Sequence, residues 1–260
     1  MKVSIIIPAY NEEKRIGKTL EEYSEFFNNL KTIGILDYEI LIVINNTKDR
    51  TEEIVKVFQR ENKNIRYLNL KMGGKGLAII EGFKDSLSRK NDLIGFVDAD
   101  MATPPNAYYD LIKNISNSDG IIASRYIKNS IVSPKQSIQR IIVSRIFNFM
   151  IRSLFLFPYA DTQCGAKLFK RESIKKIIKN LGLTQWAFDV DLLYQAKIAR
   201  LAVTEFPTIW ADKEYSKINF IKAGPRMVLS SIRLRIMYSP FRRLIKLYLL
   251  MPKWIRIDKR

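Results

Sequence analysis

Histidine is missing from this sequence of 260 residues, and cysteine occurs once, at Cys164. Without an imidazole group, the protein cannot use histidine as a general base, a nucleophile or a metal ligand. A single cysteine excludes an internal disulfide and a cysteine-based zinc site, and it agrees with a reducing compartment. Any metal ion that binds must therefore be held by oxygen atoms.

Acidic residues are missing between positions 120 and 160, where six lysines and arginines stand without a counter-charge. Residues 213–260 carry 13 basic and two acidic residues, whereas residues 1–119 are nearly balanced, with 17 against 18. Both basic segments are rich in apolar residues, a combination that favours an anionic membrane surface as the partner. We expect no nucleic acid, because none of the usual nucleic-acid-binding modules is present.

The first 120 residues alternate short apolar runs with longer amphipathic stretches, which predicts an α/β fold with a mostly parallel sheet flanked by helices. Polar or glycine-rich loops follow the expected strands and begin at Pro8, Asn45, Gly73 and Asp98. Because the carboxyl ends of parallel strands lie at one edge of a sheet, these loops should form one cleft. The strands are expected at residues 3–7, 38–44, 65–70 and 93–97.

Two carboxylates, Asp98 and Asp100, stand two positions apart after the fourth expected strand. They repel each other at close range, and a divalent cation would remove that repulsion. Carboxylate oxygens suit Mg²⁺ or Mn²⁺, which are usually shared with substrate phosphates. The alternative is a turn or a solvated loop, where aspartate is common. The position at the edge of the predicted sheet favours the metal site.

A glycine-rich turn with one lysine, at residues 73–76, begins the helix expected before that strand. Backbone N–H groups at a helix start, together with the Lys75 ammonium, can bind phosphate. The spacing is not that of a P-loop, so a purely structural turn is an equal alternative.

Three stretches, IIIPAYNEE, GGKG and VDADMATPP, follow one another in an order and spacing that resembles the family 2 glycosyltransferases of GT-A fold. In the second half, ASRY at 123–126, DTQCGAKLF at 161–169 and WAFDVDLL at 186–193 resemble the dolichyl-phosphate hexosyltransferases. The last stretch is most similar to the dolichyl-phosphate β-glucosyltransferase branch. The resemblance implies a Rossmann-like GT-A catalytic domain over residues 1–223, followed by a basic amphipathic segment at 224–260.

The resemblance also implies a reaction, in which a hexose moves with inversion from a nucleotide sugar to dolichyl or polyprenyl phosphate. Glucose from UDP-glucose is the leading expectation, and mannose from GDP-mannose is the second. The acceptor phosphate is already anionic, so it needs cationic groups and no general base, which agrees with the missing histidine. The implied nucleotide-sugar site comprises Pro8, Ala9, Tyr10, Glu12, Asn45, Lys75, Asp98, Ala99 and Asp100; the implied metal ligands are Asp98 and Asp100; the implied acceptor-phosphate residues are Arg125, Arg140 and Lys217.

Asp189 and Asp191 complete an expected catalytic set with Asp98, Asp100 and Arg125. Members of this fold often place a catalytic carboxylate near the start of a late helix, and Asp189 matches that place. Because the acceptor needs no base, either carboxylate could instead orient the acceptor or bind a sugar hydroxyl. A plain helix cap is the alternative for Asp189.

Two positions depart from the family pattern. Asn45 stands where many members carry an aspartate that recognises the base, which leaves the choice between uracil and guanine open. Ala102 stands where mannosyl members often carry a glutamine, which favours the glucosyl branch.

Two basic segments, a helix at about 137–157 and the C-terminal residues 224–260, are expected to lie on a membrane surface. Within the first, Arg140, Ser144, Asn148 and Arg152 recur every four residues as a narrow polar stripe. The arginines argue against a simple membrane crossing, and a core or dimer helix is the alternative. We therefore expect a peripheral protein at the cytoplasmic face of a membrane, with a homo-oligomer left open.

Two rival functions remain at this point. Transfer to a soluble or polysaccharide acceptor would make Asp189 or Asp191 an essential base. A non-enzymatic protein that binds RNA or acidic lipid would have no need of Asp98 and Asp100.

Overall fold

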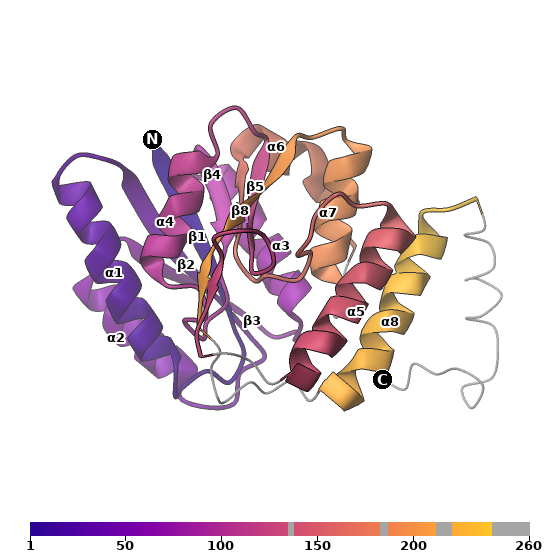
Figure 1. The fold of residues 1–260 in the computed structure, drawn as a ribbon. Coiled ribbons are helices and arrows are strands. Elements are labelled where there is room, and N and C mark those ends of the chain that lie inside the picture. Colours follow the sequence, from indigo (N-terminus) through magenta and orange to yellow (C-terminus); the bar gives the residue numbers. More distant parts are fainter. Residues whose placement is uncertain (135–137, 183–186, 212–219, 241–260) are drawn as a thin grey trace.

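Seven strands form the sheet at the centre of this computed structural model, which describes residues 1–260 except 135–137, 183–186, 212–219 and 241–260 (Figure 1). In chain order the strands are β1 (Lys2–Ala9), β2 (Asp37–Asn45), β3 (Ile65–Leu70), β4 (Leu93–Phe96), β5 (Gly120–Ser124), β7 (Lys167–Lys170) and β8 (Val203–Pro207). Across the sheet their order is β3-β2-β1-β4-β7-β5-β8. All pairs are parallel except those of β7, which is antiparallel to β4 and β5. The predicted mostly parallel sheet is confirmed.

Helices cover both faces of the sheet. On one face lie α1 (Ile16–Thr32), α2 (Thr51–Glu61) and α4 (Pro105–Asn114), which share one hydrophobic cluster with the strands. On the other face lie α3 (Lys75–Ser88), α6 (Arg171–Ile177), a 3₁₀ turn (Ile178–Asn180) and α7 (Phe188–Ile198), with a second cluster. The central strands β1 and β2 are buried on both sides, which explains why they read as continuous apolar runs.

Strand β7 brings a late segment of the chain into the middle of the sheet. Lys167 pairs in register with Phe96 on one side and with Ile122 on the other. The approach is close, because a Cβ atom on Gly95 would lie 2.3 Å from the Lys167 carbonyl oxygen. The loop that leads into β7 therefore lies beside the carboxyl end of β4, where Asp98 follows.

Helices α5 (Ile138–Phe155) and α8 (Phe220–Met237) lie side by side at one end of the sheet (Figure 1). They pack on the back of α7 through a third cluster that includes Phe155 and Leu234. Helix α5 matches the helix predicted at 137–157. Helix α8 crosses the predicted domain boundary between residues 223 and 224, and this boundary stays a prediction. The short strands β6 (Ile131–Val132) and β9 (Ile209–Trp210) form a separate parallel pair.

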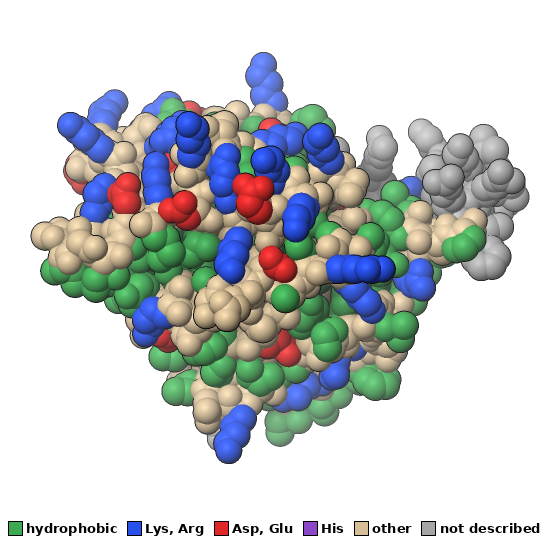
Figure 2. Space-filling model, turned by 90° about the horizontal axis from the view of Figure 1, so that it is seen from above, with side chains coloured by type: hydrophobic (Ala, Val, Ile, Leu, Met, Phe, Trp, Pro, Cys, Tyr) green, Lys and Arg blue, Asp and Glu red, His purple; other side chains and the backbone are tan. Residues whose placement is uncertain are grey.

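Within the described residues, no helix has both the length and the apolar character that crossing a membrane would require. Figure 2 shows the molecule from above, where lysine and arginine side chains are spread among acidic and hydrophobic ones and do not gather in one patch. The described lysines and arginines therefore form no separate basic patch on this face.

Candidate active site

The polar loops at the carboxyl ends of β1 and β2 and the glycine turn meet through Asn45, the last residue of β2. Its Nδ2 donates to the Ala9 carbonyl oxygen at 3.0 Å, and its Oδ1 accepts from the Gly74 backbone N at 3.1 Å. Gly74 has a φ of +138°, a conformation that glycine adopts readily. Asn45 thus ties the end of β1 to the turn that begins α3, and both ends of its amide are occupied there.

Lys75, the first residue of α3, lies between two carboxylates of the site. Its Nζ is 2.7 Å from Asp98 Oδ1 and 3.7 Å from Asp189 Oδ2. Burial alone would lower the pKa of Lys75, but Asp189 and Asp98 outweigh it and raise the pKa above its usual value. The structure brings Lys75 and Asp98, both predicted for the nucleotide-sugar site, side by side, and the lysine stays charged.

A second lysine, Lys167, holds Asp189 from the opposite side. Its Nζ donates to Asp189 Oδ1 at 2.6 Å and to the Cys164 carbonyl oxygen at 2.6 Å, and the side chain is fully buried. Burial would raise the pKa of Asp189, but Lys167 and Lys75 outweigh it and leave the pKa below its usual value. A carboxylate in this state is a weak proton acceptor.

Asp98 lies against the loop that enters β7. A Cβ atom on Gly165 would lie 1.8 Å from Asp98 Oδ2, so only glycine leaves room for the carboxylate. Gly165, in the stretch 161–169, therefore lies directly under the expected metal ligand.

Asp100 is turned back on its own loop. Its Oδ1 accepts from the Ala102 backbone N at 3.0 Å, and its Oδ2 lies 3.8 Å from Arg15 Nη1. The same arginine forms two hydrogen bonds with Glu12, each 2.7 Å long. Burial, and then the charge of Asp98, raise the pKa of the Asp100 carboxyl. Asp98 and Asp100 thus each face a cation of their own in this structure, Lys75 for Asp98 and Arg15 for Asp100.

The expected metal fits these residues only in part. Among the described residues, no three Asp, Glu, Cys or His side chains converge in the way that a cation held by protein alone would need. Two partly exposed carboxylates, at Asp98 and Asp100, are nevertheless the usual protein share of a Mg²⁺ site whose other ligands are substrate phosphates and water. The donor set thus fits an ion that arrives with a diphosphate.

The other residues that are predicted to bind the nucleotide lie along the same edge of the sheet. Tyr10 is half exposed, whereas Pro8, Ala9 and Ala99 are buried. The Ala99 carbonyl oxygen accepts from Thr19 Oγ1 at 2.8 Å, which fixes the Asp98–Asp100 loop to α1. The nucleobase of a bound nucleotide could contact Tyr10. To bond Asn45, it would have to compete with Ala9 and Gly74 for the side-chain amide.

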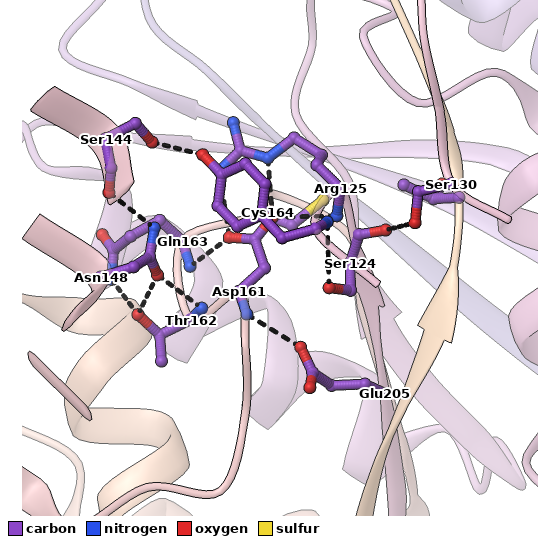
Figure 3. Close-up of polar contacts among 12 residues, drawn as sticks. Ser124, Arg125, Ser130, Ser144, Asn148, Asp161, Thr162, Gln163, Cys164 and Glu205 are labelled. Carbon is purple, nitrogen blue, oxygen red and sulfur yellow. Dashed lines mark hydrogen bonds and ion pairs between the residues drawn. The ribbon is translucent and has the colours of Figure 1, made fainter. Parts of the chain in front are cut away.

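Arg125, predicted to bind the acceptor phosphate, forms a two-pronged ion pair with Asp161 (Figure 3). Its Nε is 2.7 Å from Asp161 Oδ2, and its Nη2 is 3.0 Å from Oδ1. Although burial would raise the pKa of Asp161, Arg125 outweighs it and lowers the pKa. Glu205 fixes the same loop through the backbone N of Asp161, at 2.8 Å. Arg125 is thus held rigidly, with its charge largely balanced.

Asp191 lies on the other side of α7, away from this group. Its oxygens accept from the Gly182 backbone N at 2.7 Å and from Tyr238 Oη at 2.9 Å. Burial raises the pKa of its carboxyl. These contacts tie α7 to α8, so the structure brings Asp189 to the site and leaves Asp191 out of it.

Two predicted acceptor residues have no position to compare. Arg140 belongs to α5, but its side chain lies outside the described residues, and so does the whole of Lys217. Arg15, Asp161 and Lys167 are absent from the site predicted from the sequence, although all three contact its carboxylates or Arg125. The signal for Asp161 and Lys167 was their place in the DTQCGAKLF stretch, where charged residues sit inside an apolar context.

The chain was compared with protein families, with characterised proteins and with solved structures. The model of glycosyl transferase family 2 matches residues 4–178. A dolichyl-phosphate beta-glucosyltransferase of Dictyostelium discoideum is 32% identical, over 91% of this chain and 74% of that protein. The human protein of the same name is 30% identical, over 93% of this chain and 78% of that one.

Solved structures with the same fold include glucosyl-3-phosphoglycerate synthase from Mycobacterium tuberculosis. Its complex with Mn²⁺, UDP and glucosyl-3-phosphoglycerate has a TM-score of 0.65, at 15% identity, over 90% of this chain and 79% of that one. Its complex with Mn²⁺ and UDP-glucose has a TM-score of 0.63, also at 15% identity. At this identity the likeness concerns the fold, and it agrees with the predicted GT-A architecture.

Proposed function

This chain belongs to glycosyl transferase family 2 and to the group of dolichyl-phosphate beta-glucosyltransferases, and we propose that it transfers glucose from UDP-glucose to dolichyl or another polyprenyl phosphate, with inversion. One observation carries the proposal. A single loop, 161–165, holds Arg125 at its first residue and underlies Asp98 at its last. Four residues span at most about 14 Å, so a cation for the acceptor and the carboxylates for the donor lie within reach of one substrate pair.

The donor half of the site suits a nucleoside diphosphate. Asp98 and Asp100 would hold Mg²⁺ or Mn²⁺, which when bound neutralises the charge that the leaving diphosphate gains. Lys75 adds a permanent cation beside Asp98, at the amino end of α3, where the helix dipole also favours an anion. The solved relatives of this fold contain Mn²⁺ with UDP or UDP-glucose, which supports the donor class.

The acceptor half suits a phosphate monoester. Arginine carries five N–H donors, and Arg125 would bind a phosphate oxygen with those that Asp161 does not accept. Burial would lower the pKa of Arg125, but Asp161 outweighs it, so the guanidinium keeps its charge. An acceptor phosphate oxygen forms the new bond to the anomeric carbon as the bond to the diphosphate breaks on the opposite face. That oxygen carries no proton to remove, so the weak basicity of Asp189 is no obstacle. Asp189 instead holds Lys75 and Lys167 in place.

We also propose that the outer face of α5 rests on the membrane that contains the lipid acceptor. This face, defined by Ile138, Ile142, Ile146 and Phe149, is apolar and exposed, and Phe149 is 69% exposed. Arg145 and Arg152, two helical turns apart, lie along one edge of it. Exposed apolar side chains beside arginines are the pattern of a helix that lies in the interface of an anionic bilayer. Location at the cytoplasmic face stays a prediction.

The experiment uses the full chain with Mn²⁺ or Mg²⁺, a short polyprenyl phosphate, and radiolabelled UDP-glucose or GDP-mannose in parallel. Label extracted into the organic phase from UDP-glucose only would support the proposal, and Asp100→Ala should abolish it. Label from GDP-mannose only would replace glucose by mannose. No extractable label from a folded protein would overturn the acceptor, and a soluble acceptor would then be tested.

A further inference from the structure

Asn148 is a buried polar residue in the middle of α5, on the side opposite to its apolar outer face. It is 2% exposed. Its Nδ2 donates to the Ser144 carbonyl oxygen one turn earlier, at 3.1 Å. Its Oδ1 accepts two hydrogen bonds from Thr162, from the backbone N and from Oγ1, each 3.0 Å long (Figure 3). A buried asparagine is costly unless it is paired, and here its pairing reaches outside its own helix.

Thr162 is the second residue of the loop that joins the two halves of the site. Its neighbour Asp161 holds Arg125, and the Gln163 backbone N donates to Asp161 Oδ1 at 3.1 Å. Gln163 Nε2 also donates to Thr162 Oγ1, at 3.0 Å. The two bonds from Asn148 therefore fix the loop at a point directly beside the carboxylate that orients Arg125.

Helix α5 makes a second contact near Arg125, through Tyr126. Ser144 Oγ is hydrogen-bonded to Tyr126 Oη, and the Arg145 guanidinium lies 4.2 Å from the centre of the Tyr126 ring. Arg125 itself lies 5.1 Å from the same ring. One helix thus supports both the neighbour of Arg125 in the chain and the loop that carries its ion-pair partner.

We infer that Asn148 is a positioning residue for acceptor binding, which acts through Thr162 and Asp161 on the guanidinium of Arg125. The inference rests on the proposed function, in which Arg125 binds the acceptor phosphate. Because Asn148 lies on the inner side of the helix whose outer side is apolar, it also links that outer face to the acceptor half of the site. The donor half shares the far end of this loop, at Cys164 and Gly165, and is held in addition by Asn45 and by the pair of Lys75 and Asp98.

The test is Asn148→Leu in the full chain, with Asn114→Leu as the matched control. Asn114 makes the same bond to a carbonyl oxygen four residues earlier, in α4, but it is exposed and has no described bond to a loop. For Asn148→Leu we expect kcat/KM for polyprenyl phosphate to fall about tenfold or more, because small displacements of a positioning group are costly. We expect an unchanged KM for the nucleotide sugar and unchanged binding to anionic vesicles.

A second variant tests the contact from the side of the loop. Thr162→Val keeps the volume, removes the bonds of Oγ1 to Asn148 and to Gln163, and leaves the bond from the backbone N. It carries the test if Asn148→Leu does not fold. Thr162→Val should also lower kcat/KM for polyprenyl phosphate. In the double variant, the factor by which kcat/KM falls should be smaller than the product of the two single factors, because the two substitutions remove the same contact. The inference would be overturned if kcat/KM fell equally for the polyprenyl phosphate and for the nucleotide sugar. It would also be overturned if Asn148→Leu lowered kcat/KM no more than Asn114→Leu does. Absence of transfer by the unmodified chain would instead overturn the proposed function.

Discussion

Gly165 lies directly beneath the carboxylate of Asp98, and no side chain fits between them: a Cβ atom there would stand 1.8 Å from Oδ2. The relationship joins the loop before β7 to the end of β4, two segments far apart in the sequence. It makes the position of Asp98 depend on a residue that has no chemistry of its own.

Gly165→Ala should therefore displace Asp98 and reduce transfer by roughly a hundredfold, the cost of misplacing a reacting group by about 1 Å. Steady-state kinetics at increasing Mn²⁺ would show a weaker response to the metal. Gly17→Ala is the control, since its Cβ would make only an ordinary contact of 3.7 Å with Ile54 in a helix. Full activity of Gly165→Ala would mean that the Asp98 carboxylate is not held where the structure has it.

The buried pair of Lys167 and Asp189 should behave as one unit in unfolding experiments. Among the described residues, Asp189→Leu leaves the Cys164 carbonyl oxygen as the hydrogen-bond acceptor of the buried Lys167 ammonium, and breaking a buried pair in this way costs about 3–5 kcal/mol. Lys167→Met should also destabilise, although Asp189 keeps Lys75 at 3.7 Å. The double variant should lose less free energy of unfolding than the two single losses together.

Urea denaturation of the four proteins would measure this coupling. The exposed pair of Lys84 and Glu81 offers a matched control, since its Nζ–Oε1 distance is similarly short, at 2.7 Å. Because solvent screens that pair, Lys84→Met with Glu81→Leu should show a coupling below about 1 kcal/mol. Strictly additive losses at Lys167 and Asp189 would contradict the prediction.

The strand-end motifs could be predicted from the sequence because each depends on a local pattern. An apolar run followed by Asp98 and Asp100 indicates both the strand and its functional edge. The GGKG turn likewise placed Lys75 at a helix start, and the structure confirms it. Local periodicity was enough here, since a parallel sheet brings all these ends together.

The partners of these residues could not be predicted, because they depend on which segments pack together. Strand β7 is inserted antiparallel between β4 and β5, and this alone brings Lys167 to Asp189 and Gly165 to Asp98. The stripe of Ser144 and Asn148 was recognised in α5, but its periodicity does not tell which side faces the protein. In the structure Ser144 and Asn148 face the protein, beside the buried Ile151 and Phe155. Ile142, Ile146 and Phe149 face outward, so the helix carries apolar side chains on both sides.

Asp191→Asn should retain most of the transfer activity, because its carboxylate serves Gly182 and Tyr238 and not the site. Burial raises the pKa of Asp191, so its ionised form is disfavoured in the folded state. At neutral pH the neutral asparagine should leave the melting temperature equal or higher, and this difference should shrink as the pH falls. Loss of transfer with unchanged donor binding, alongside a normal melting temperature, would instead identify Asp191 as a base.

The ion pair of Arg125 and Asp161 should make the protein sensitive to acid. Asp161 has a lowered pKa in the folded state, so it stabilises the fold at pH values above its unfolded pKa, about 3.9. That contribution is lost as the pH falls through the lower folded value. Asp161→Asn should be less stable by about 3–5 kcal/mol at neutral pH, because it leaves Arg125 unpaired.

The difference in stability between Asp161→Asn and the unmodified protein should narrow only below about pH 4, where Asp161 becomes protonated in the unfolded chain. Melting temperatures of both proteins, measured from pH 3 to pH 7, would follow this difference. A gap that already closes between pH 5 and pH 7 would assign the acid sensitivity to another group.

The outer face of α5 should determine how strongly the protein binds lipid. Replacing Ile146 and Phe149 by serine removes two exposed apolar side chains, each worth about 1.5–3 kcal/mol when buried in a bilayer. Sedimentation with vesicles that contain phosphatidylserine should show binding reduced at least about tenfold. Ile33→Ser is the control, because Ile33 is 67% exposed, close to the 63% of Ile146, but follows α1 and is remote from α5.

The same double variant separates membrane contact from catalysis. Transfer to a long polyprenyl phosphate embedded in vesicles should fall with binding, whereas transfer to a short, water-soluble acceptor should not, because neither side chain contacts Arg125 or Asp161. If transfer to both acceptors fell equally, the outer face would act on the site itself and not through the lipid. If transfer to neither acceptor fell, the apolar residues of α5 would bind a surface other than the membrane. The lipid acceptor would then have to reach Arg125 without them.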